Sequence, residues 1–375
     1  MMIYLQEGRI PAIQKKGDYA VVAITKHGTE LARKLQANFP LVDVYYMGKF
    51  AKGDEAERGI QMFFGSVRLL LPALFSVYKG IIGIFSIGAM VRLSAPLIKD
   101  KKSDPAVVVI DDKGEHVISV LSGHLGGAND LVREVAAILG ARPVITTASE
   151  VQQTIPVDLF GQRFGWEWES AEKLTPVSAS VVNEEHVAIV QESGEKNWWM
   201  YDSPIPKNIR IYPSITEAIA AQPRAALVVT HRVLAKEEEE ILNNGVLYRP
   251  KVIVLGIGCN RGTSANEIEQ VIIETLHELK FSVRSVKAVC TIDLKRDEQG
   301  LLEVVRKYGW ELVCYTPAQL NQVEMEQPSE TVYRYTGAYG VSEPAAKLYG
   351  RLNRLVLDKK KSGNVTISVG VIRYE

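Results

Sequence analysis

Residues 117–141 read VISVLSGHLGGANDLVREVAAILGA, and the rest of the chain is interpreted outward from this stretch. Its apolar beginning, Val117 to Leu121, predicts a strand, and from Leu131 onward apolar residues recur at helical spacing. Between them lies the turn Ser122–Gly127, whose glycines permit positive φ angles and a close approach of the backbone to a ligand. The helix N-terminus that follows such a turn is a place where anions bind.

His124 stands inside this turn, and an imidazole can move a proton near neutral pH. The alternative is a structural histidine that packs within the turn. Asn129 and Asp130 lie in or just before the first helical turn, where they either cap the helix or face the same pocket. We therefore predict His124 as the first catalytic candidate and Asp130 as a further one. Ligand contacts are expected from Ser122, Gly123, Gly126, Gly127 and Asn129.

Composition restricts the class of protein. A chain of 375 residues predicts two or three domains, and its 44 basic and 44 acidic residues cancel, which gives no global electrostatic case for nucleic acid. The three cysteines show no metal-type pairing, and this odd count suits a reducing cytoplasm, where we expect the protein to be. No apolar run approaches the ~20 residues of a membrane span, and the N-terminus has no signal-peptide pattern.

Strands alternate with helices through the first part of the chain, which predicts a parallel or mixed α/β sheet. Residues 60–78 are expected to form one long helix, and Asp112–Gly114 predicts a hairpin between strands 107–111 and 116–121. Residues 1–18 are interpreted as an extension that adds a strand. Ligands collect at the carboxyl ends of strands in such sheets, and a second strand-turn-helix unit predicts substrate contacts at Ser86, Gly88, Ala89 and Arg92.

The character of the sequence changes after about residue 148. Residues rich in Trp, Pro and Glu predict a small α+β domain, and a third strand-turn-helix unit begins near Arg249. We therefore expect an N-terminal parallel or mixed α/β domain at 1–148, a small middle α+β domain at 149–246 and a C-terminal α/β domain at 247–375. Within the last of these, residues 332–335 are interpreted as a strand.

The third glycine-rich turn, Gly256–Gly262, lacks the spacing of a dinucleotide fingerprint, so a nucleotide is disfavoured. It is either a structural turn or a ligand cradle. Cys259 is either a nucleophile activated by the helix N-terminus or a packing residue. Arg92 and Arg261 either grip carboxylates or are solvated. Glu343 is favoured at its helix start by the dipole alone, and is also our second candidate for acid–base work.

Together these motifs resemble the CbiG family of cobalamin biosynthesis, the cobalt-precorrin-5A hydrolases. The resemblance covers about residues 45–373 and is looser in the middle. The motifs on which the resemblance rests are GIFSIGAMVR (83–92), Asp111 with Gly114, SGHLGGAND (122–130), VITTAS (144–149), GIGCNRG (256–262), IDLKRDEQGL (292–301) and VSEPAA (341–346).

The resemblance implies an enzyme that opens the ring A δ-lactone of cobalt-precorrin-5A with water, in the anaerobic route to cobalamin. It further implies that a meso carbon and its methyl group leave as acetaldehyde, giving cobalt-precorrin-5B. No dissociable cofactor is expected, because the cobalt belongs to the substrate. We add the hypothesis that His124 activates water or shuttles a proton, and that backbone N–H groups of Gly126 and Gly127 stabilise the oxyanion.

Carboxylates at the edge of the macrocycle are expected to bind all three turns. In the third turn and beside it we predict contacts from Gly258, Cys259, Arg261, Gly262 and Lys295. A non-catalytic tetrapyrrole carrier in the same pathway is the alternative, and a nucleotide-binding α/β enzyme is a third reading. The expected partners are the corrinoid and water, with no nucleic acid and no membrane. The oligomeric state is left open, with a homodimer as one alternative.

Overall fold

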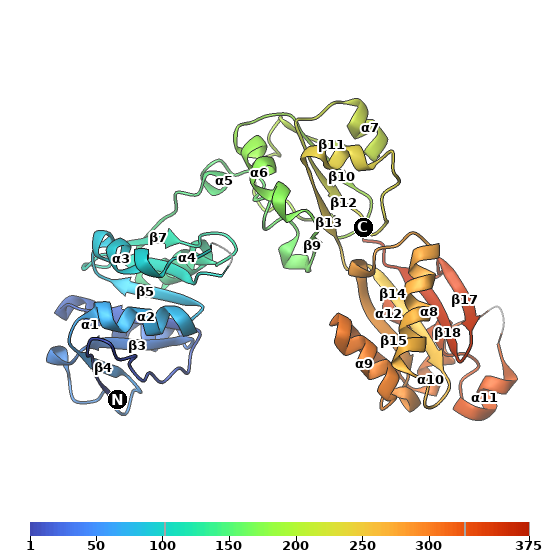
Figure 1. The fold of residues 1–375 in the computed structure, drawn as a ribbon, viewed down its shortest axis with the longest axis horizontal. Helices are drawn as coiled ribbons and strands as arrows, with labels where there is room; N and C mark the ends of the chain where they lie inside the picture. Colours follow the sequence, from blue (N-terminus) through green and yellow to red (C-terminus); the bar gives the residue numbers. More distant parts are fainter. Residues whose placement is uncertain (101–102, 326–327, 375) are drawn as a thin grey trace. The chain divides into compact units, whose positions relative to one another are not determined.

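The computed structural model describes residues 1–100, 103–325 and 328–374 (Figure 1). The chain forms two compact units, Met1–Leu159 and Phe160–Glu375, and each is described by itself. Mixed and parallel sheets flanked by helices occur in both units, which confirms the predicted α/β class. Among the described residues, no helix combines the length and the apolar character needed to cross a membrane.

The first unit is built on an eight-stranded sheet in the order β1-β4-β3-β2-β5-β6-β7-β8. Its continuous β-branched runs, such as Ala106–Ile110, suit strands that are buried on both faces. The strands are β1 (Met2–Tyr4), β2 (Tyr19–Ala23), β3 (Val42–Met47), β4 (Gln61–Phe64), β5 (Gly80–Ile84), β6 (Ala106–Ile110), β7 (His116–Leu121) and β8 (Arg142–Val144).

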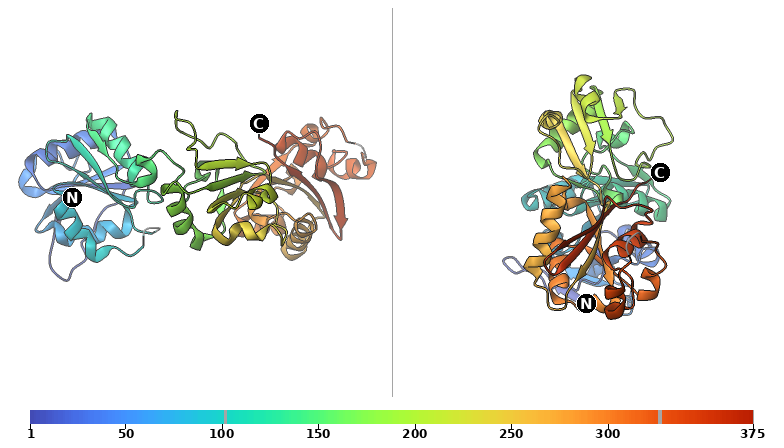
Figure 2. Two further views of the ribbon diagram at one scale, coloured as in Figure 1. Left: turned by 90° about the horizontal axis from the view of Figure 1, so that it is seen from above. Right: turned by 90° about the vertical axis from the view of Figure 1, so that its right-hand side faces the viewer.

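Helices cover both faces of this sheet, as Figure 2 shows for the blue and cyan part of the chain. Leu35 of α1 and Val135 of α4 belong to the apolar core on one face, whereas Leu74 of α2 and Met90 of α3 belong to the core on the other. The helices of this unit are α1 (Lys26–Asn38), α2 (Val67–Val77), α3 (Ile87–Ser94), α4 (Ala128–Leu139) and α5 (Ala148–Val151).

The direction of β7 separates two of the predicted ligand turns. Strand β7 is antiparallel to β6, as the predicted hairpin requires, while β5 and β6 are parallel. The turn after β7 therefore lies at the opposite end of the sheet from the turn after β5. The turns Ser86–Ala89 and Ser122–Gly127 are each at the carboxyl end of a strand, but they do not share one edge. Strand β8 is parallel to β7, so the segment after Val144 joins the Ser122–Gly127 turn.

The N-terminal extension adds a strand, as predicted, because β1 pairs in parallel with β4. The single long helix expected over 60–78 is wrong. Gln61–Phe64 forms β4, Gly65 turns with φ 111°, and Ser66 caps α2 by accepting a hydrogen bond from the Arg68 N–H. A positive φ is readily adopted by glycine, and it interrupts an apolar run that helical spacing alone joins together.

The second unit begins with a five-stranded sheet in the order β11-β10-β12-β13-β9, in which only β9 is antiparallel to its neighbour. The predicted boundary after residue 246 falls inside β13, which pairs with β12 and β9, so this sheet extends to Arg249. Its elements are β9 (Glu167–Trp168), α6 (Leu174–Val182), β10 (Val187–Gln191), β11 (Ile209–Tyr212), α7 (Ile215–Ala220), β12 (Ala225–Val229) and β13 (Gly245–Arg249). The division into three domains stays a prediction.

A second five-stranded sheet follows, in the order β16-β15-β14-β18-β17. Helices α8 and α9 pack on one face, and α12 packs on the other. The residues expected as a strand at 332–335 belong to helix α11, which Ser329 caps. The elements are β14 (Ile253–Cys259), α8 (Ala265–Glu278), β15 (Val286–Ile292), α9 (Gln299–Tyr308), β16 (Glu311–Tyr315), α10 (Pro317–Leu320), α11 (Glu330–Thr336), α12 (Ser342–Gly350), β17 (Leu357–Ser362) and β18 (Val365–Val371).

His231 lies where the two sheets of the second unit are joined. The Ser282 N–H donates to the His231 carbonyl at 2.8 Å, and the His231 ring packs edge-on against Phe281 with centroids 4.7 Å apart. Burial lowers the pKa of His231 to about 4, against the opposing effect of Glu192 and with smaller lowering effects of Arg232 and Arg249. The neutral imidazole is therefore the form that this junction accommodates.

We expect the stability of the second unit to fall as pH drops from about 6.5 to about 4, because the unfolded chain binds a proton there that folded His231 does not. Above about pH 6.5 the imidazole is neutral in both the folded and the unfolded chain, so His231 no longer makes the stability depend on pH. Urea unfolding at pH 7 and pH 5 measures it, and His231→Gln should lose much of the difference. His277→Gln, which changes an exposed histidine, should retain the difference, and an unchanged pH dependence in His231→Gln contradicts the prediction.

Candidate functional site

The turn after β7 holds His124 between two side chains from later in the chain. The Ser149 hydroxyl lies 3.0 Å from His124 Nε2, and an Asp158 carboxylate oxygen lies 3.2 Å from His124 Nδ1. The side chains of His124 and Asp158 are 18% and 16% exposed, whereas Ser149 is 6% exposed. The cluster is therefore recessed, with the histidine partly open to solvent.

A second set of polar contacts fixes the loops that carry this cluster. Buried Asn129 accepts from the Ser119 hydroxyl at 2.8 Å and donates to the Thr147 hydroxyl at 3.0 Å, which ties the turn after β7 to the segment after β8. A side chain at Gly126 would bring its Cβ within 2.3 Å of Ser122, which itself has φ 58°. The turn is therefore held by close packing, and Asn129 serves this scaffold.

Asp130 is not brought to His124. Its side chain is 86% exposed and pairs with Arg133 at 2.9 Å, on the outside of the first turn of α4. The carboxylate that does reach the histidine is Asp158, which sequence reasoning missed. The N–H of Gly127 donates to the His124 carbonyl at 2.8 Å, so of the two predicted oxyanion donors only the Gly126 N–H remains a candidate.

The predicted residues around the turn after β5 stay apart from His124, at the other end of the sheet. Ser86 precedes α3 and accepts from the backbone of Ala89 at 3.0 Å. Arg92 is exposed and donates to the Gly88 carbonyl one turn earlier at 3.0 Å. The substrate contacts predicted for these four residues stay predictions.

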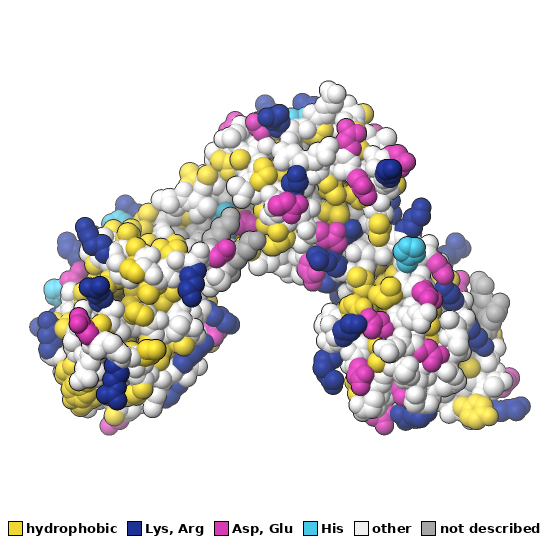
Figure 3. All heavy atoms as spheres, viewed as in Figure 1, with side chains coloured by type: hydrophobic (Ala, Val, Ile, Leu, Met, Phe, Trp, Pro, Cys, Tyr) yellow, Lys and Arg dark blue, Asp and Glu magenta, His cyan; other side chains and the backbone are white. Residues whose placement is uncertain are grey.

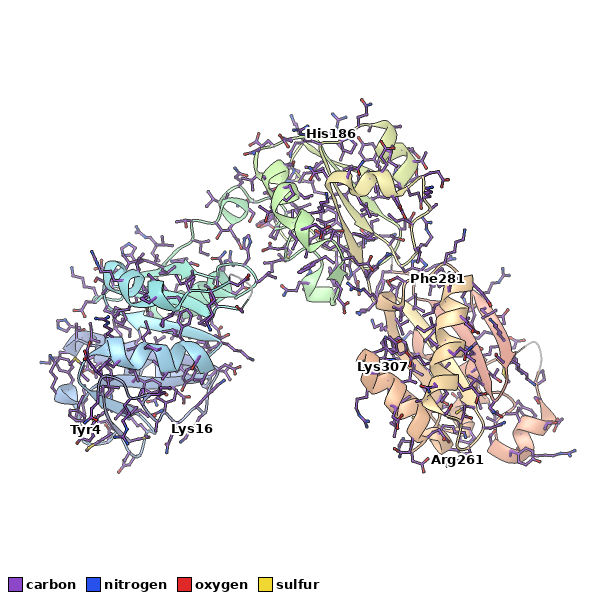
Figure 4. The ribbon with its side chains drawn as sticks, viewed as in Figure 1. Tyr4, Lys16, His186, Arg261, Phe281 and Lys307 are labelled. Atoms are coloured by element: carbon purple, nitrogen blue, oxygen red, sulfur yellow. The ribbon has the colours of Figure 1, made fainter. Side chains whose placement is uncertain are left out.

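The C-terminal sheet carries a cavity of about 650 Å³ at the carboxyl end of β14. Four predicted residues, Gly258, Cys259, Arg261 and Lys295, line it together with the acid–base candidate Glu343. Met325, Tyr335 and β17 form a further wall that the sequence does not predict, and Tyr335 reaches the cavity from helix α11 rather than from a strand. In Figure 4 the labelled Arg261 lies at the opposite end of the C-terminal part from Phe281.

The charge of this cavity favours anions. Of the charged side chains among its described lining residues, Arg261, Lys295, Lys359 and Lys361 are basic and Glu343 is acidic. Arg261 is paired with Asp297 at 2.6 Å, so the excess of positive charge comes mainly from Lys359 and Lys361 on β17. Glu343 is paired with Lys347 at 2.7 Å. Elsewhere, basic and acidic side chains are interspersed over the face that Figure 3 presents. A local excess of positive charge beside a cavity attracts carboxylates, whereas the neutral chain as a whole does not.

Two predicted groups in the third turn are committed elsewhere. The Gly262 N–H donates to a carboxylate oxygen of buried Glu298 at 2.9 Å, so an internal anion already occupies this position. Glu298 also pairs with Lys295 at 3.2 Å. Burial raises the pKa of the Cys259 thiol, which disfavours the thiolate and supports the packing role over the nucleophile.

Among residues 1–100, 103–325 and 328–374, no three His, Cys, Asp or Glu side chains gather where they could hold one ion. A histidine cluster in one unit and a cationic cavity in the other characterise an α/β protein equipped for acid–base chemistry and for binding a small anionic molecule.

Comparison with known proteins gives the family to which the chain belongs. Family profiles match residues 70–150 (cobalamin synthesis G N-terminal), 155–250 (cobalamin biosynthesis central region) and 253–370 (cobalamin synthesis G C-terminus). A cobalt-precorrin-5A hydrolase from Priestia megaterium is 69% identical over 374 residues, covering 100% of both chains. Another from Salmonella typhimurium is 30% identical and covers 95% of this chain and 98% of that protein.

Among solved structures, cobalamin biosynthesis protein chiG from Agrobacterium tumefaciens is 27% identical, covering 32% of this chain and 96% of that one with a TM-score of 0.26. The three family profiles together span most of the chain from residue 70 onward, and the Priestia megaterium relative covers its N-terminal extension as well. The chain belongs to the CbiG family of cobalamin biosynthesis.

Proposed function

We propose that this protein is a cobalt-precorrin-5A hydrolase. It opens the ring A δ-lactone with water and releases acetaldehyde, leaving cobalt-precorrin-5B. The observation that carries the proposal is the 69% identity over the full length of a cobalt-precorrin-5A hydrolase. The geometry adds a histidine that contacts a hydroxyl and a carboxylate, which suits it to transfer protons in lactone hydrolysis.

The substrate supplies its own cobalt, so the protein needs no dissociable cofactor, and water is the second substrate. The protein acts in the cytoplasm, since a free-thiol protein of a biosynthetic route suits a reducing compartment. Peripheral carboxylates of the macrocycle bind the cationic cavity of the C-terminal sheet. His124 carries the acid–base chemistry, and Glu343 is the second candidate.

The decisive experiment incubates the purified protein with cobalt-precorrin-5A and follows acetaldehyde with alcohol dehydrogenase and NADH. The hydrolase releases one acetaldehyde for each substrate consumed. A carrier, the alternative function, binds the corrinoid and changes its spectrum without releasing acetaldehyde, and that result overturns the proposal. Thermal protection by nucleotides but not by corrinoids likewise contradicts it, because a ligand stabilises the protein that binds it.

The cationic cavity leads to a separate prediction. Replacing both Lys359 and Lys361 with alanine is expected to raise KM about tenfold with little change in kcat. Each lysine is expected to form one exposed ion pair with a substrate carboxylate, and the loss of ~0.7 kcal/mol for each of the two pairs corresponds to about tenfold in binding. Both side chains are exposed on β17, so the fold should be unaffected. The matched control is Lys360→Ala on the same strand, whose side chain pairs with Glu278 instead. Equal KM values for the double variant and the control contradict the binding role of the cavity.

A further inference from the structure

Ser149, His124 and Asp158 form a chain of two polar contacts, a hydrogen bond and an ion-pair contact. The serine hydroxyl meets one ring nitrogen of the histidine at 3.0 Å, and the aspartate meets the other at 3.2 Å. An ionised carboxylate can only accept, so in the neutral imidazole the nitrogen that faces Asp158 carries the hydrogen. In that tautomer the nitrogen that faces Ser149 is the acceptor, and the hydroxyl donates to it. This assignment follows from the network of contacts.

We propose that Ser149 is a nucleophile for carboxylic esters and lactones, with His124 as its base and Asp158 as the residue that positions the imidazole. An imidazole whose acceptor nitrogen is engaged by a serine hydroxyl takes the proton of that serine before it takes one from water. Such an arrangement is recognised by geometry and roles rather than by the order of residues in the chain, which here is His124, Ser149, Asp158.

The sheet explains why these residues meet. Strands β7 and β8 are parallel, so the turn that carries His124 and the segment that carries Ser149 leave the same end of the sheet. Asn129 links the two segments through Ser119 and Thr147. Behind the serine, the Thr154 N–H donates to the Ser149 carbonyl at 2.9 Å. The Ser149 carbonyl is therefore held directly, and the segment before it is tied to α4, as a nucleophile that must meet a carbonyl in one orientation requires.

The exposure of the cluster fits a peripheral ester group. Ser149 is 6% exposed, while the His124 side chain beside it is 18% exposed, and all residues of the Ser122–Gly127 turn are half-buried. A whole macrocycle does not need to enter this recess. A lactone at the edge of the macrocycle needs to bring only its carbonyl to the hydroxyl.

The reaction of the lactone, which rests on the proposed function, balances as follows. The Ser149 oxygen adds to the lactone carbonyl carbon and its proton passes to His124. The ring C–O bond breaks and the proton moves to the leaving oxygen, which gives an ester on Ser149 and a hydroxyl on the methyl-bearing carbon. Water, deprotonated by His124, adds to the ester carbonyl, and Ser149 leaves with the proton. One water is consumed, and no oxidant or reductant is required.

Acetaldehyde then forms without further reagents. The new hydroxyl loses its proton, its oxygen becomes the aldehyde carbonyl, and the adjacent C–C bond breaks. The electron pair of that bond passes to the macrocycle, which takes up a proton. Because the leaving oxygen stays on the substrate, the ester on Ser149 adds the mass of the whole corrinoid, or that mass less acetaldehyde when the C–C bond breaks first.

The first test uses an alkyl fluorophosphonate and does not depend on the corrinoid. The serine oxygen displaces fluoride from phosphorus, and His124 takes the proton. Mass mapping should find the label on Ser149 in the wild type and on no other serine at a comparable rate. Ser149→Ala should abolish the label and His124→Ala should slow it by about 10³-fold. Labelling without acetaldehyde release would support the nucleophile and refute the proposed function.

The second test measures acetaldehyde release and the mass of acid-quenched protein during turnover. Ser149→Ala should lower kcat by about 10³-fold or more and abolish the corrinoid adduct. Asp158→Asn should slow labelling and turnover by about 10²-fold or more at unchanged thermal stability, and Asp158→Glu should recover part of the loss.

The matched control is Thr154→Val, which removes a neighbouring buried hydroxyl that has no hydrogen-bond partner among the described residues. It should keep wild-type labelling and turnover. A folded Ser149→Ala protein that releases acetaldehyde at the wild-type rate overturns the nucleophile and leaves the proposed function standing.

Discussion

Replacing His124 with alanine is expected to lower kcat for acetaldehyde release by about 10³-fold or more, while KM changes by less than about threefold. The imidazole is the titratable group that contacts both Ser149 and Asp158, so its loss removes proton transfer without removing the cationic cavity. Initial rates at saturating cobalt-precorrin-5A give kcat directly. Added imidazole should restore part of the activity, because the truncated side chain leaves room for it.

Two further variants separate chemistry from folding. His124→Gln keeps a side chain that can hydrogen-bond but cannot take up a proton near neutral pH, so it should be nearly as inactive as His124→Ala. His116→Gln changes a histidine at the start of β7, the strand that leads into the turn of His124. The His116 side chain is 42% exposed and lies 3.4 Å from Asp111, and this variant should remain active. Near wild-type release by folded His124→Ala would remove His124 from the reaction.

The order and type of most elements could be predicted, because each depends on patterns within a few residues. Hydrophobic runs gave the buried strands, and Asp112–Gly114 gave the hairpin that turns β7 antiparallel. What was missed depends on single backbone angles, as at Gly65, or on pairing between distant strands. A hairpin between β6 and β7 reverses the chain, so it implies that the turns after β5 and β7 lie at opposite ends of the sheet. That conclusion also requires β5 and β6 to be parallel neighbours, which the strand order shows.

The candidate site could be predicted only at its centre. His124 was identified from its glycine-rich turn, and Asp130 was proposed beside it because it is near in sequence, whereas Asp158 was missed. Asp158 reaches the histidine through a segment that follows α5, and no local pattern distinguishes it from an exposed loop carboxylate. Ser149 lies in the VITTAS motif. Its position beside the histidine follows from the parallel pairing of β7 with β8, which the sequence does not show locally.

Replacing Gly256 with alanine is expected to loosen the C-terminal sheet around α12 by about 3 kcal/mol. A Cβ at this position would lie 1.8 Å from the Ser342 carbonyl oxygen and 2.6 Å from its carbon, both of them backbone atoms. Helix α12 therefore crosses β14 in direct backbone contact, and it cannot yield by a rotamer change. The helix must move away from the sheet, and it carries Glu343 at the edge of the cationic cavity.

Amide hydrogen exchange measures the loss of stability around α12 locally. A local measurement is needed because the chain has two units, which need not unfold in a single transition. Protection of the β14 and β18 amides should fall about a hundredfold, as ~3 kcal/mol implies, while the sheet of the first unit keeps its protection. Gly258→Ala is the matched control on the same face of β14, because its Cβ would meet Val341 at 3.7 Å, an ordinary contact. Equal protection in both variants would mean that α12 can shift at little cost, and Gly256 would then owe its place in the motif to something other than helix packing.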